Sequence, residues 1–336
     1  MNILSLFDGM SCGQIALNRA NIEYDNYFAS EIDKYAIKVT QKNYPNTIQL
    51  GDITQIKGSD LPQIDLLIGG SPCQGFSIAG KQLNFNDERS KLFFEYVRLL
   101  KECNPKYFLL ENVKMKKEYE KVITEYLGVQ PIEINSSLVS AQNRKRLYWM
   151  NISIEQPKDK GIFLKDILEK QVDEKYYLGN LKNKTNADVV VKDDLLVGDY
   201  RNDEGFRWRG KAKAPTLTSG SKNSGTQYNS LVKLGNIYPS KGQNGNIYGT
   251  DGKSPSLSSG SGVLGNGTGS CNAPKILSTN QLTNNNNIRR LTPVECERLQ
   301  TVPDNYTDGI SDTQRYKMLG NGWTVDVIAH ILKNIK

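Results

Sequence analysis

A glycine-rich stretch directly after a buried strand is the feature that most constrains how this chain can fold. The apolar run 64–68 has the length and composition of a buried strand, and residues 69–77 follow it with the sequence Gly-Gly-Ser-Pro-Cys-Gln-Gly-Phe-Ser. The two glycines end the strand, and Pro72 fixes the backbone immediately before Cys73. Ligands bind at the carboxyl ends of strands in open α/β sheets, so the sequence predicts that Cys73 lies at such an edge.

A carboxylate follows the next apolar run in the same way. Leu109-Leu110 lead into Glu111-Asn112-Val113, which places an acidic side chain at the end of a second predicted strand. A free cysteine is more often a small buried hydrophobe than a nucleophile. The polar, glycine-rich surroundings of Cys73 favour the nucleophile, and we expect a thiol and a carboxylate at neighbouring strand ends.

Three earlier strand ends have the residues expected of a nucleoside pocket. The predicted strand Asn2–Phe7 is followed by a turn with glycines, and the next strand ends at Glu31, whose carboxylate can accept from both ribose hydroxyls. A third short strand ends at Gly51-Asp52-Ile53, where Asp52 can accept from an adenine amino group. A nicotinamide or flavin enzyme is disfavoured, because Gly9 and Gly13 do not form the G-x-G-x-x-G motif.

Composition narrows the class of protein. The chain has 336 residues, 38% of them hydrophobic, which is enough for one large core and a smaller lobe. Five cysteines without paired spacing and a single histidine predict neither a disulfide framework nor a metal site. We expect a cytoplasmic monomer without a membrane span, and the net charge of +7 agrees with a polyanionic partner.

Together, these motifs resemble those of the DNA cytosine-5 methyltransferases of bacteria and phages, which use S-adenosyl-L-methionine. The matching motifs are, in the family's order, Phe7-Asp8-Gly9 with Gly13, Glu31, Asp52, Pro72-Cys73-Gln74, Glu111-Asn112-Val113, Gln142-Asn143-Arg144-Lys145-Arg146, Arg289-Arg290-Leu291-Thr292-Pro293 with Glu295 and Leu299-Gln300, and Gly320-Asn321-Gly322 with Val325. Each triplet alone has low specificity, whereas the ordered set is highly specific.

The resemblance implies an α/β protein with a Rossmann-like methyltransferase fold, in which a mostly parallel twisted sheet has helices on both faces. It also implies a smaller, loop-rich, mainly β lobe that recognises the DNA sequence. We expect the catalytic domain to span residues 1–160, the recognition domain 161–287, and a return segment, 288–336, to complete the catalytic domain.

The resemblance also assigns roles to individual residues. Cys73 would add to C6 of a flipped-out cytosine, and Glu111 would protonate or hydrogen-bond N3. Arg144 and Arg146 would hold that carboxylate, the base carbonyl or a phosphate. The residues expected at the cofactor are Phe7, Asp8, Gly9, Gly13, Glu31, Ile32, Asp52, Ile53, Pro72, Asn321 and Val325. Those expected at double-stranded DNA are Gln74, Ser77, Lys81, Arg89, Gln142, Thr216 and Leu217.

An internal repeat marks the predicted recognition lobe. The nine residues Lys-Ala-Pro-Thr-Leu-Thr-Ser-Gly-Ser that begin at Lys213 recur, with small changes, from Lys253 onward. The segment is rich in Gly, Ser, Asn and Thr, which also fits disorder, but random coil does not repeat itself so closely. The family carries a Thr-Leu pair near the flipped base. Thr216-Leu217 is the literal match, and Ser256-Leu257 is the alternative.

Other functions stay open at this point. A cytosine-5 methyltransferase acting on tRNA shares the catalytic motifs, although the repeat lobe favours duplex DNA. A weak or inactive DNA-binding paralogue is disfavoured because the four predicted catalytic residues are present. A loop-rich structural protein does not explain the ordered motifs. The recognised DNA site and the presence of an accompanying restriction endonuclease are not encoded in any motif that we can interpret.

Overall fold

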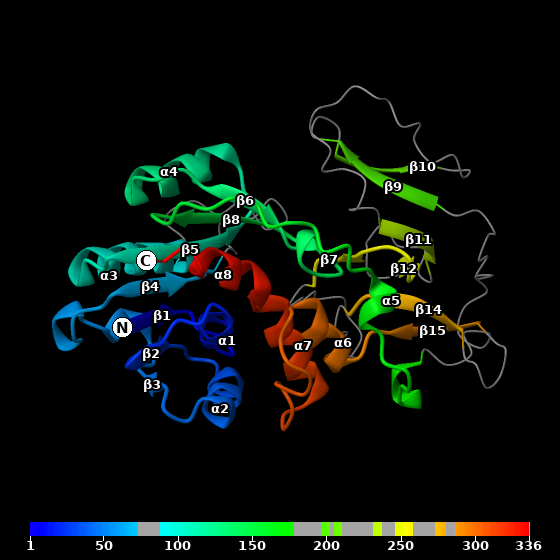
Figure 1. Ribbon diagram of the computed structural model, residues 1–336, viewed down its shortest axis with the longest axis horizontal. Helices are drawn as coiled ribbons and strands as arrows, with labels where there is room; N and C mark the ends of the chain where they lie inside the picture. Colours follow the sequence, from blue (N-terminus) through cyan, green and yellow to red (C-terminus); the bar gives the residue numbers. More distant parts are fainter. Residues whose placement is uncertain are drawn as a thin grey trace.

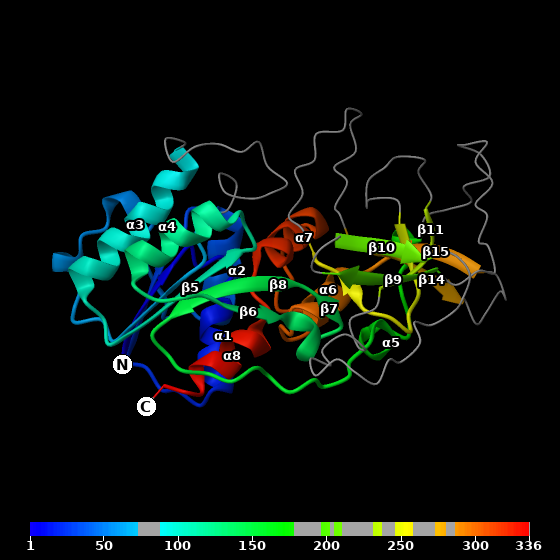
Figure 2. The same ribbon diagram turned by 90° about the horizontal axis from the view of Figure 1, so that it is seen from above.

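The protein folds into a large α/β lobe and a smaller β lobe, which lie side by side (Figure 1). The computed structural model describes residues 1–72, 88–177, 196–201, 205–209, 231–236, 246–257, 273–279 and 286–335. The amino terminus and the end of the chain lie close together on the large lobe in both views (Figures 1 and 2).

The large lobe is built on a seven-stranded sheet with the order β3-β2-β1-β4-β5-β8-β6. Its first five strands are parallel, and β8 runs antiparallel between β5 and β6. The strands are β1 (Asn2–Leu6), β2 (Asn26–Ser30), β3 (Ile48–Gln49), β4 (Leu66–Gly69), β5 (Tyr107–Val113), β6 (Ile132–Asn135) and β8 (Lys145–Met150). The predicted mostly parallel sheet is therefore confirmed.

Helices cover both faces of this sheet, and each face has its own hydrophobic cluster. Neighbouring strand residues alternate between the clusters, with Ile3 and Ile68 in one and Leu4 and Leu67 in the other. Helices α1 (Cys12–Arg19), α2 (Lys34–Asn43) and α8 (Val325–Leu332) pack on the first face, and α3 (Glu88–Cys103) and α4 (Lys117–Leu127) on the second. Burial on both faces explains why the strands are apolar runs rather than alternating patterns.

The smaller lobe contains a six-stranded sheet with the order β10-β9-β11-β12-β14-β15. Its strands are β9 (Leu196–Arg201), β10 (Gly205–Arg209), β11 (Leu231–Asn236), β12 (Asn246–Tyr248), β14 (Lys275–Thr279) and β15 (Asn286–Arg290). This confirms the expected mainly β lobe. Strand β15 spans the boundary that the sequence predicted after residue 287, so the return to the large lobe begins at the end of a strand of the smaller lobe.

The return segment lies between the lobes before it reaches the large sheet (Figures 1 and 2). Helix α6 (Pro293–Leu299) starts with proline at its first turn, and Thr292 and Glu295 form a capping box there. Helix α7 (Asp312–Asn321) follows, and α8 then packs beside α1. The last elements of the chain thus close the face of the sheet that the first helix opened.

Two structural features are absent from the described ranges. No helix there is long and apolar enough to cross a membrane. The same residues contain no group of three or more His, Cys, Asp or Glu side chains arranged to hold a metal ion.

A buried ion pair joins the smaller lobe to the return segment. Arg289 on β15 donates two hydrogen bonds of 2.7 Å to the carboxylate of Glu295 on α6, and the side chains are 2% and 0% exposed. The backbone N–H groups of Glu169 and Thr292 also donate to this carboxylate. A carboxylate that accepts from donors on three segments fixes where β15 ends and α6 begins.

We expect Glu295→Gln to lower the free energy of unfolding by about 3–5 kcal/mol, because it leaves the Arg289 charge buried without its counter-ion. Asp304→Asn is the matched control, since Asp304 also pairs with an arginine, Arg298, but with side chains 31% and 45% exposed. The control should cost about 1 kcal/mol or less. Urea unfolding checks both, and equal losses would contradict a special role for the buried pair.

Candidate active site

The candidate site lies at the carboxyl ends of β1, β2, β4 and β5. Asn112 on β5 donates through Nδ2 to Oγ of Ser71, at 3.0 Å, directly after β4. This side-chain bond ties the two strand ends together in the buried interior. Because Ser71 stands two residues before Cys73, the bond fixes the point from which the predicted nucleophile's loop departs; Cys73 itself lies outside the described residues.

An ion pair and a hydrogen bond hold the carboxylate of Glu111. Arg146 Nε lies 3.0 Å from Oε1, and the indole N–H of Trp323 donates to Oε2 at 3.2 Å. Gly70 makes room for this arrangement, since a Cβ there would lie 2.9 Å from the indole nitrogen and 3.0 Å from Oε2. The predicted pairing of Arg146 with the Glu111 carboxylate is therefore present. The side chains of Glu111 and Trp323 fill the space beside Gly70.

Arg144 makes a different set of contacts from those of Arg146. Its buried guanidinium donates to the carbonyl oxygens of Leu257, Gly322 and Gly320 at 3.0, 3.1 and 3.3 Å. Burial, together with the nearby charge of Arg146, lowers the pKa of Arg144 to about 9. The group therefore stays cationic at neutral pH and joins the smaller lobe to the return segment through carbonyl dipoles.

Three of the five cysteines can be compared in the described part of the chain. Cys12, Cys103 and Cys296 are all free and buried. Burial raises the pKa of Cys12 to about 12 and raises that of Cys103, so both stay thiols at neutral pH. These cysteines have the properties of structural residues, which leaves Cys73 and Cys271, both outside the described ranges, as the candidates for a nucleophile.

The turn after β1 presents an acidic group with an unused acceptor. Phe7, Gly9 and Ser11 all have positive φ, of 58°, 62° and 63°, a backbone shape that is uncommon for residues other than glycine. Asp8 Oδ1 accepts from the hydroxyls of Ser5 and Tyr27, while Asp8 Oδ2 is buried and has no hydrogen-bond partner. A buried orphan acceptor fits a site that takes a donor group from a ligand.

Glu31, at the end of β2, has its carboxylate fixed by the backbone. The N–H of Gly9 donates to Oε2 at 2.8 Å, and the N–H groups of Ile32 and Asp33 donate to Oε1. The side chain of Ile32 is 77% exposed beside it, unusual for a large apolar residue. A carboxylate with a remaining acceptor position next to an exposed apolar surface fits a ribose and its base.

The other predicted cofactor residues differ in how deeply they are buried. Ile53 and Val325 are buried, Pro72 is half-buried, and Asp52 and Asn321 are exposed. Gly13 serves helix packing, because a Cβ there would lie 2.5 Å from the Tyr27 hydroxyl and 2.7 Å from Ile68.

The second copy of the repeat is docked on the predicted arginine motif. Strand β13 (Ser254–Pro255) pairs in parallel with β7 (Gln142–Asn143), and the N–H of Ser254 donates to Ala141 at 2.7 Å. The ammonium of Lys253, fully buried, donates to the carbonyls of Ser137, Ser140 and Ile162. Burial lowers the pKa of Lys253, and no carboxylate compensates it at hydrogen-bond distance.

Gln142 is the predicted DNA-binding residue that the structure describes most fully. Its side chain is completely buried, and neither its amide nitrogen nor its amide oxygen has a hydrogen-bond partner. Arg89 lies on α3, and nothing is described of its side chain. The remaining predicted DNA contacts, which are Gln74, Ser77, Lys81, Thr216 and Leu217, lie outside the described residues.

Sequence reasoning missed two residues of this region. Trp323 follows Gly320-Asn321-Gly322 directly, and an aromatic residue next to a predicted cofactor turn was a signal that could have been used. Lys253 opens the second repeat, but Lys213 opens the first, so the pattern did not show which copy docks.

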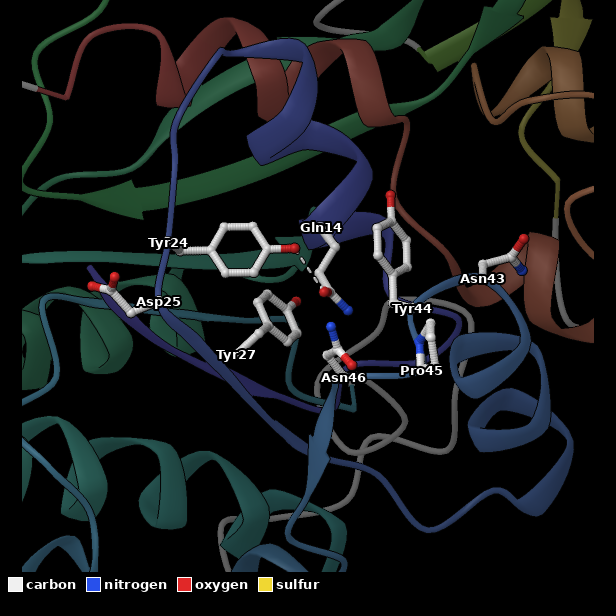
Figure 3. A pocket seen from close by; sticks show the side chains of 8 residues that line it. All are labelled: Gln14, Tyr24, Asp25, Tyr27, Asn43, Tyr44, Pro45 and Asn46. Carbon is white, nitrogen blue, oxygen red and sulfur yellow. Dashed lines mark hydrogen bonds between the residues drawn. The ribbon is translucent and has the colours of Figure 1, made fainter.

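A separate cavity of about 220 Å³ lies on the first face of the large lobe. It is lined by Gln14, Tyr24, Asp25, Tyr27, Asn43, Tyr44, Pro45 and Asn46 (Figure 3). Tyr24 donates to Gln14 Oε1 at 2.8 Å, and Tyr27 connects the wall to Asp8. Most of the lining comes from the segments before β2 and β3.

Comparisons with known proteins agree with these features. The family model of the C-5 cytosine-specific DNA methylases matches residues 1–336. The orphan methyltransferase M.SPRI of Bacillus phage SPR is 30% identical, with 100% of this chain and 97% of that protein covered. The type II methyltransferase M.HhaI of Haemophilus parahaemolyticus is 28% identical, with coverages of 100% and 94%.

Solved structures show the same fold at lower identity. The methyltransferase EhMeth of Entamoeba histolytica superposes with a TM-score of 0.67 at 20% identity, with 99% of this chain and 97% of that chain covered. A putative DNA modification methyltransferase from an E. coli prophage gives a TM-score of 0.63 at 19% identity, with coverages of 99% and 98%.

We expect the carboxyl of Asp8 to make the ligand-free protein less stable as pH rises. Burial raises its pKa from 3.8 to about 6, against the opposing hydrogen bonds from Ser5 and Tyr27. Between these two values the folded chain binds more protons than the unfolded chain. The contribution is therefore complete below about pH 4 and lost as pH passes about 6, by at most about 3 kcal/mol.

The difference between the urea unfolding curves of the wild type and Asp8→Asn isolates this effect from the other titrating groups. The wild type should lose stability relative to the variant as pH rises from about 4 to about 7. A difference that stays constant over this range would mean that Asp8 is already ionised in the folded protein.

Proposed function

The chain belongs to the family of C-5 cytosine-specific DNA methylases, and we propose that it methylates specific cytosines in double-stranded DNA through a covalent bond between Cys73 and C6 of a flipped-out base. The observation that carries the proposal is the carboxylate of Glu111, which is held on both oxygens beside the strand end that leads to Cys73. A single carboxylate fixed in this way is what proton transfer to N3 of the base requires.

The chemistry explains why these residue types stand together. C5 of cytosine is a poor nucleophile, and addition of a thiolate at C6 converts it into an enamine carbon. Cys73 forms this bond, and Glu111 gives N3 a proton as the ring takes up the electron pair. Once C5 carries the methyl group, loss of the C5 proton and return of the N3 proton to Glu111 allow the bond to Cys73 to break, which restores the aromatic ring.

S-Adenosylmethionine, when bound, supplies the methyl group. Asp8 Oδ2 would accept from its amino group, the Glu31 carboxylate would take a ribose hydroxyl, and the exposed side chain of Ile32 would cover the adenine. Asp52 and Asn321, exposed at the same edge, complete the set. These residues bind and orient, and the proton transfers belong to Glu111 and to the groups around Cys73.

A base inside a duplex is out of reach of Cys73, so the cytosine must leave the stack at a cost of a few kcal/mol. We assign the contacts that receive it to Gln142 and to the second repeat, at Ser256-Leu257. The buried amide of Gln142 has no partner, and Leu257 is joined to Arg144. Thr216-Leu217 stays the alternative.

We also propose that the enzyme is a cytoplasmic monomer, in keeping with relatives from bacteria and phages.

Transfer to tRNA is the second candidate function. The S. pombe Dnmt2 methyltransferase superposes with a TM-score of 0.62, but at 18% identity this likeness extends to the fold alone. Two observations favour duplex DNA. The lobe that contains the repeat is docked on the arginine motif, and the family that matches this chain is a family of DNA methylases.

We expect Cys73→Ser to abolish methylation of duplex DNA while leaving the affinity for DNA largely unchanged, because phosphate and base-edge contacts do not use the thiol. Transfer of labelled methyl groups to DNA and to tRNA, together with a DNA-binding titration, measures this. Cys103→Ser is the control, since that buried thiol should not be needed for chemistry. Turnover by Cys73→Ser, or wild-type transfer to tRNA alone, would overturn the proposal.

A matched pair of variants tests the role of the docked second repeat. Lys253→Met leaves three carbonyl oxygens without their donor, at about 1–3 kcal/mol for each buried group, and should detach the second copy from the arginine motif. We expect the KM for DNA to rise at least about tenfold. Lys213→Met, the equivalent change in the first copy, should have little effect. A larger effect of Lys213→Met would assign the role to Thr216-Leu217 instead.

A further inference from the structure

We propose that Trp323 is a positioning residue that sets the orientation of the Glu111 carboxylate through its indole N–H. The inference rests on the proposed role of Glu111 in activating cytosine. The indole nitrogen lies 3.2 Å from Oε2 of Glu111, whereas Arg146 Nε lies nearest to Oε1. Trp323 is buried, so this bond is shielded from competing water.

The geometry explains why a second donor is needed. The terminal torsion of a glutamate side chain is broad, and a single contact at one oxygen leaves the carboxylate free to rotate about it. Arg146 forms an ion pair with Oε1 from β8, and Trp323 donates a hydrogen bond to Oε2 from the return segment. Two partners from different elements fix the plane of the carboxylate.

Trp323 is itself fixed by the turn that carries it. The carbonyl of Gly322 accepts from Arg144 and from the amide of Gln300. A Cβ on Gly322 would lie 3.0 Å from Met10, so the turn also packs closely on the loop after β1. The indole therefore has a fixed platform from which to hold Glu111.

The alternative is that the indole only fills space in the core. Trp149 provides the comparison within the same chain, because its indole N–H donates to Thr124 Oγ1 at 3.0 Å in the buried core beneath α4. Trp323→Phe and Trp149→Phe each keep an aromatic ring and remove one buried N–H bond. Only the first of these bonds ends on Glu111.

The test measures addition to cytosine without any methyl donor. In water, the Cys73 adduct takes a solvent proton at C5, loses the original C5 hydrogen and expels the thiolate, so cytosine is recovered with an exchanged hydrogen. Release of tritium from DNA with labelled cytosine C5 therefore reports the step that Glu111 assists. Cys73→Ser gives the background, and a DNA-binding titration reports whether the complex still forms.

We expect Trp323→Phe to lower the exchange rate on saturating DNA by about tenfold, and Trp149→Phe by less than about twofold, with DNA affinity little changed in both. Gly70→Ala tests the same hydrogen bond without replacing Trp323, because its added methyl group pushes the indole and the carboxylate apart. It should slow exchange in the same way, and it decides the matter if Trp323→Phe does not fold in a thermal melt.

The outcomes separate this inference from the proposed function. A wild-type enzyme that exchanges no C5 hydrogen in DNA would overturn the role of Cys73 and Glu111. Wild-type exchange that Trp323→Phe leaves within about twofold, or that Trp149→Phe lowers equally, would show that the indole only packs in the core. A fall confined to DNA affinity, with unchanged exchange at saturation, would also contradict positioning.

Discussion

The buried guanidinium of Arg144 is the interaction on which the arrangement of the site depends. It donates to carbonyls 113 and 178 residues away in the sequence, on the second repeat and on the return segment. Burial lowers its pKa to about 9, yet the group stays charged at neutral pH. Loss of a buried cation's acceptors is costly, so the three segments are held together as one unit.

This contact explains why the chain leaves the large lobe and comes back. The turn at Gly320–Trp323 brings one donor to Glu111, leaves Asn321, a predicted cofactor residue, exposed and supplies two acceptors to Arg144. Gln300 holds the same turn through the carbonyls of Leu319 and Gly322. The predicted motifs of the last 50 residues therefore act mainly through backbone groups, with Trp323 as the side chain that reaches the candidate catalytic carboxylate.

The sequence was informative for the charged and glycine-rich motifs at the strand ends, but it did not indicate the side chains of Trp323 and Lys253. Glycines and acids punctuate the strand ends, and the pairing of Glu111 with Arg146 follows from opposite charges in two predicted motifs. The partners of Arg144 were not predictable, because backbone carbonyls leave no signature in a sequence. The end of β6 is likewise set locally, because the side chain of Asn135 accepts from the N–H of Ser137 and starts a short 3₁₀ turn.

The docked repeat also changes how chemistry and DNA recognition can be divided. A division at residues 161 and 287 would separate Lys253 and Leu257 from Ala141–Arg144, the segment on which they are docked, and would cut through β15. The described residues 246–257, 273–279 and 286–290 thus belong with the catalytic lobe in any exchange of recognition elements. What is left for exchange is the part of the lobe built on β9, β10 and β11. Sequence recognition can vary there because the contacts that orient the candidate catalytic carboxylate come from other segments.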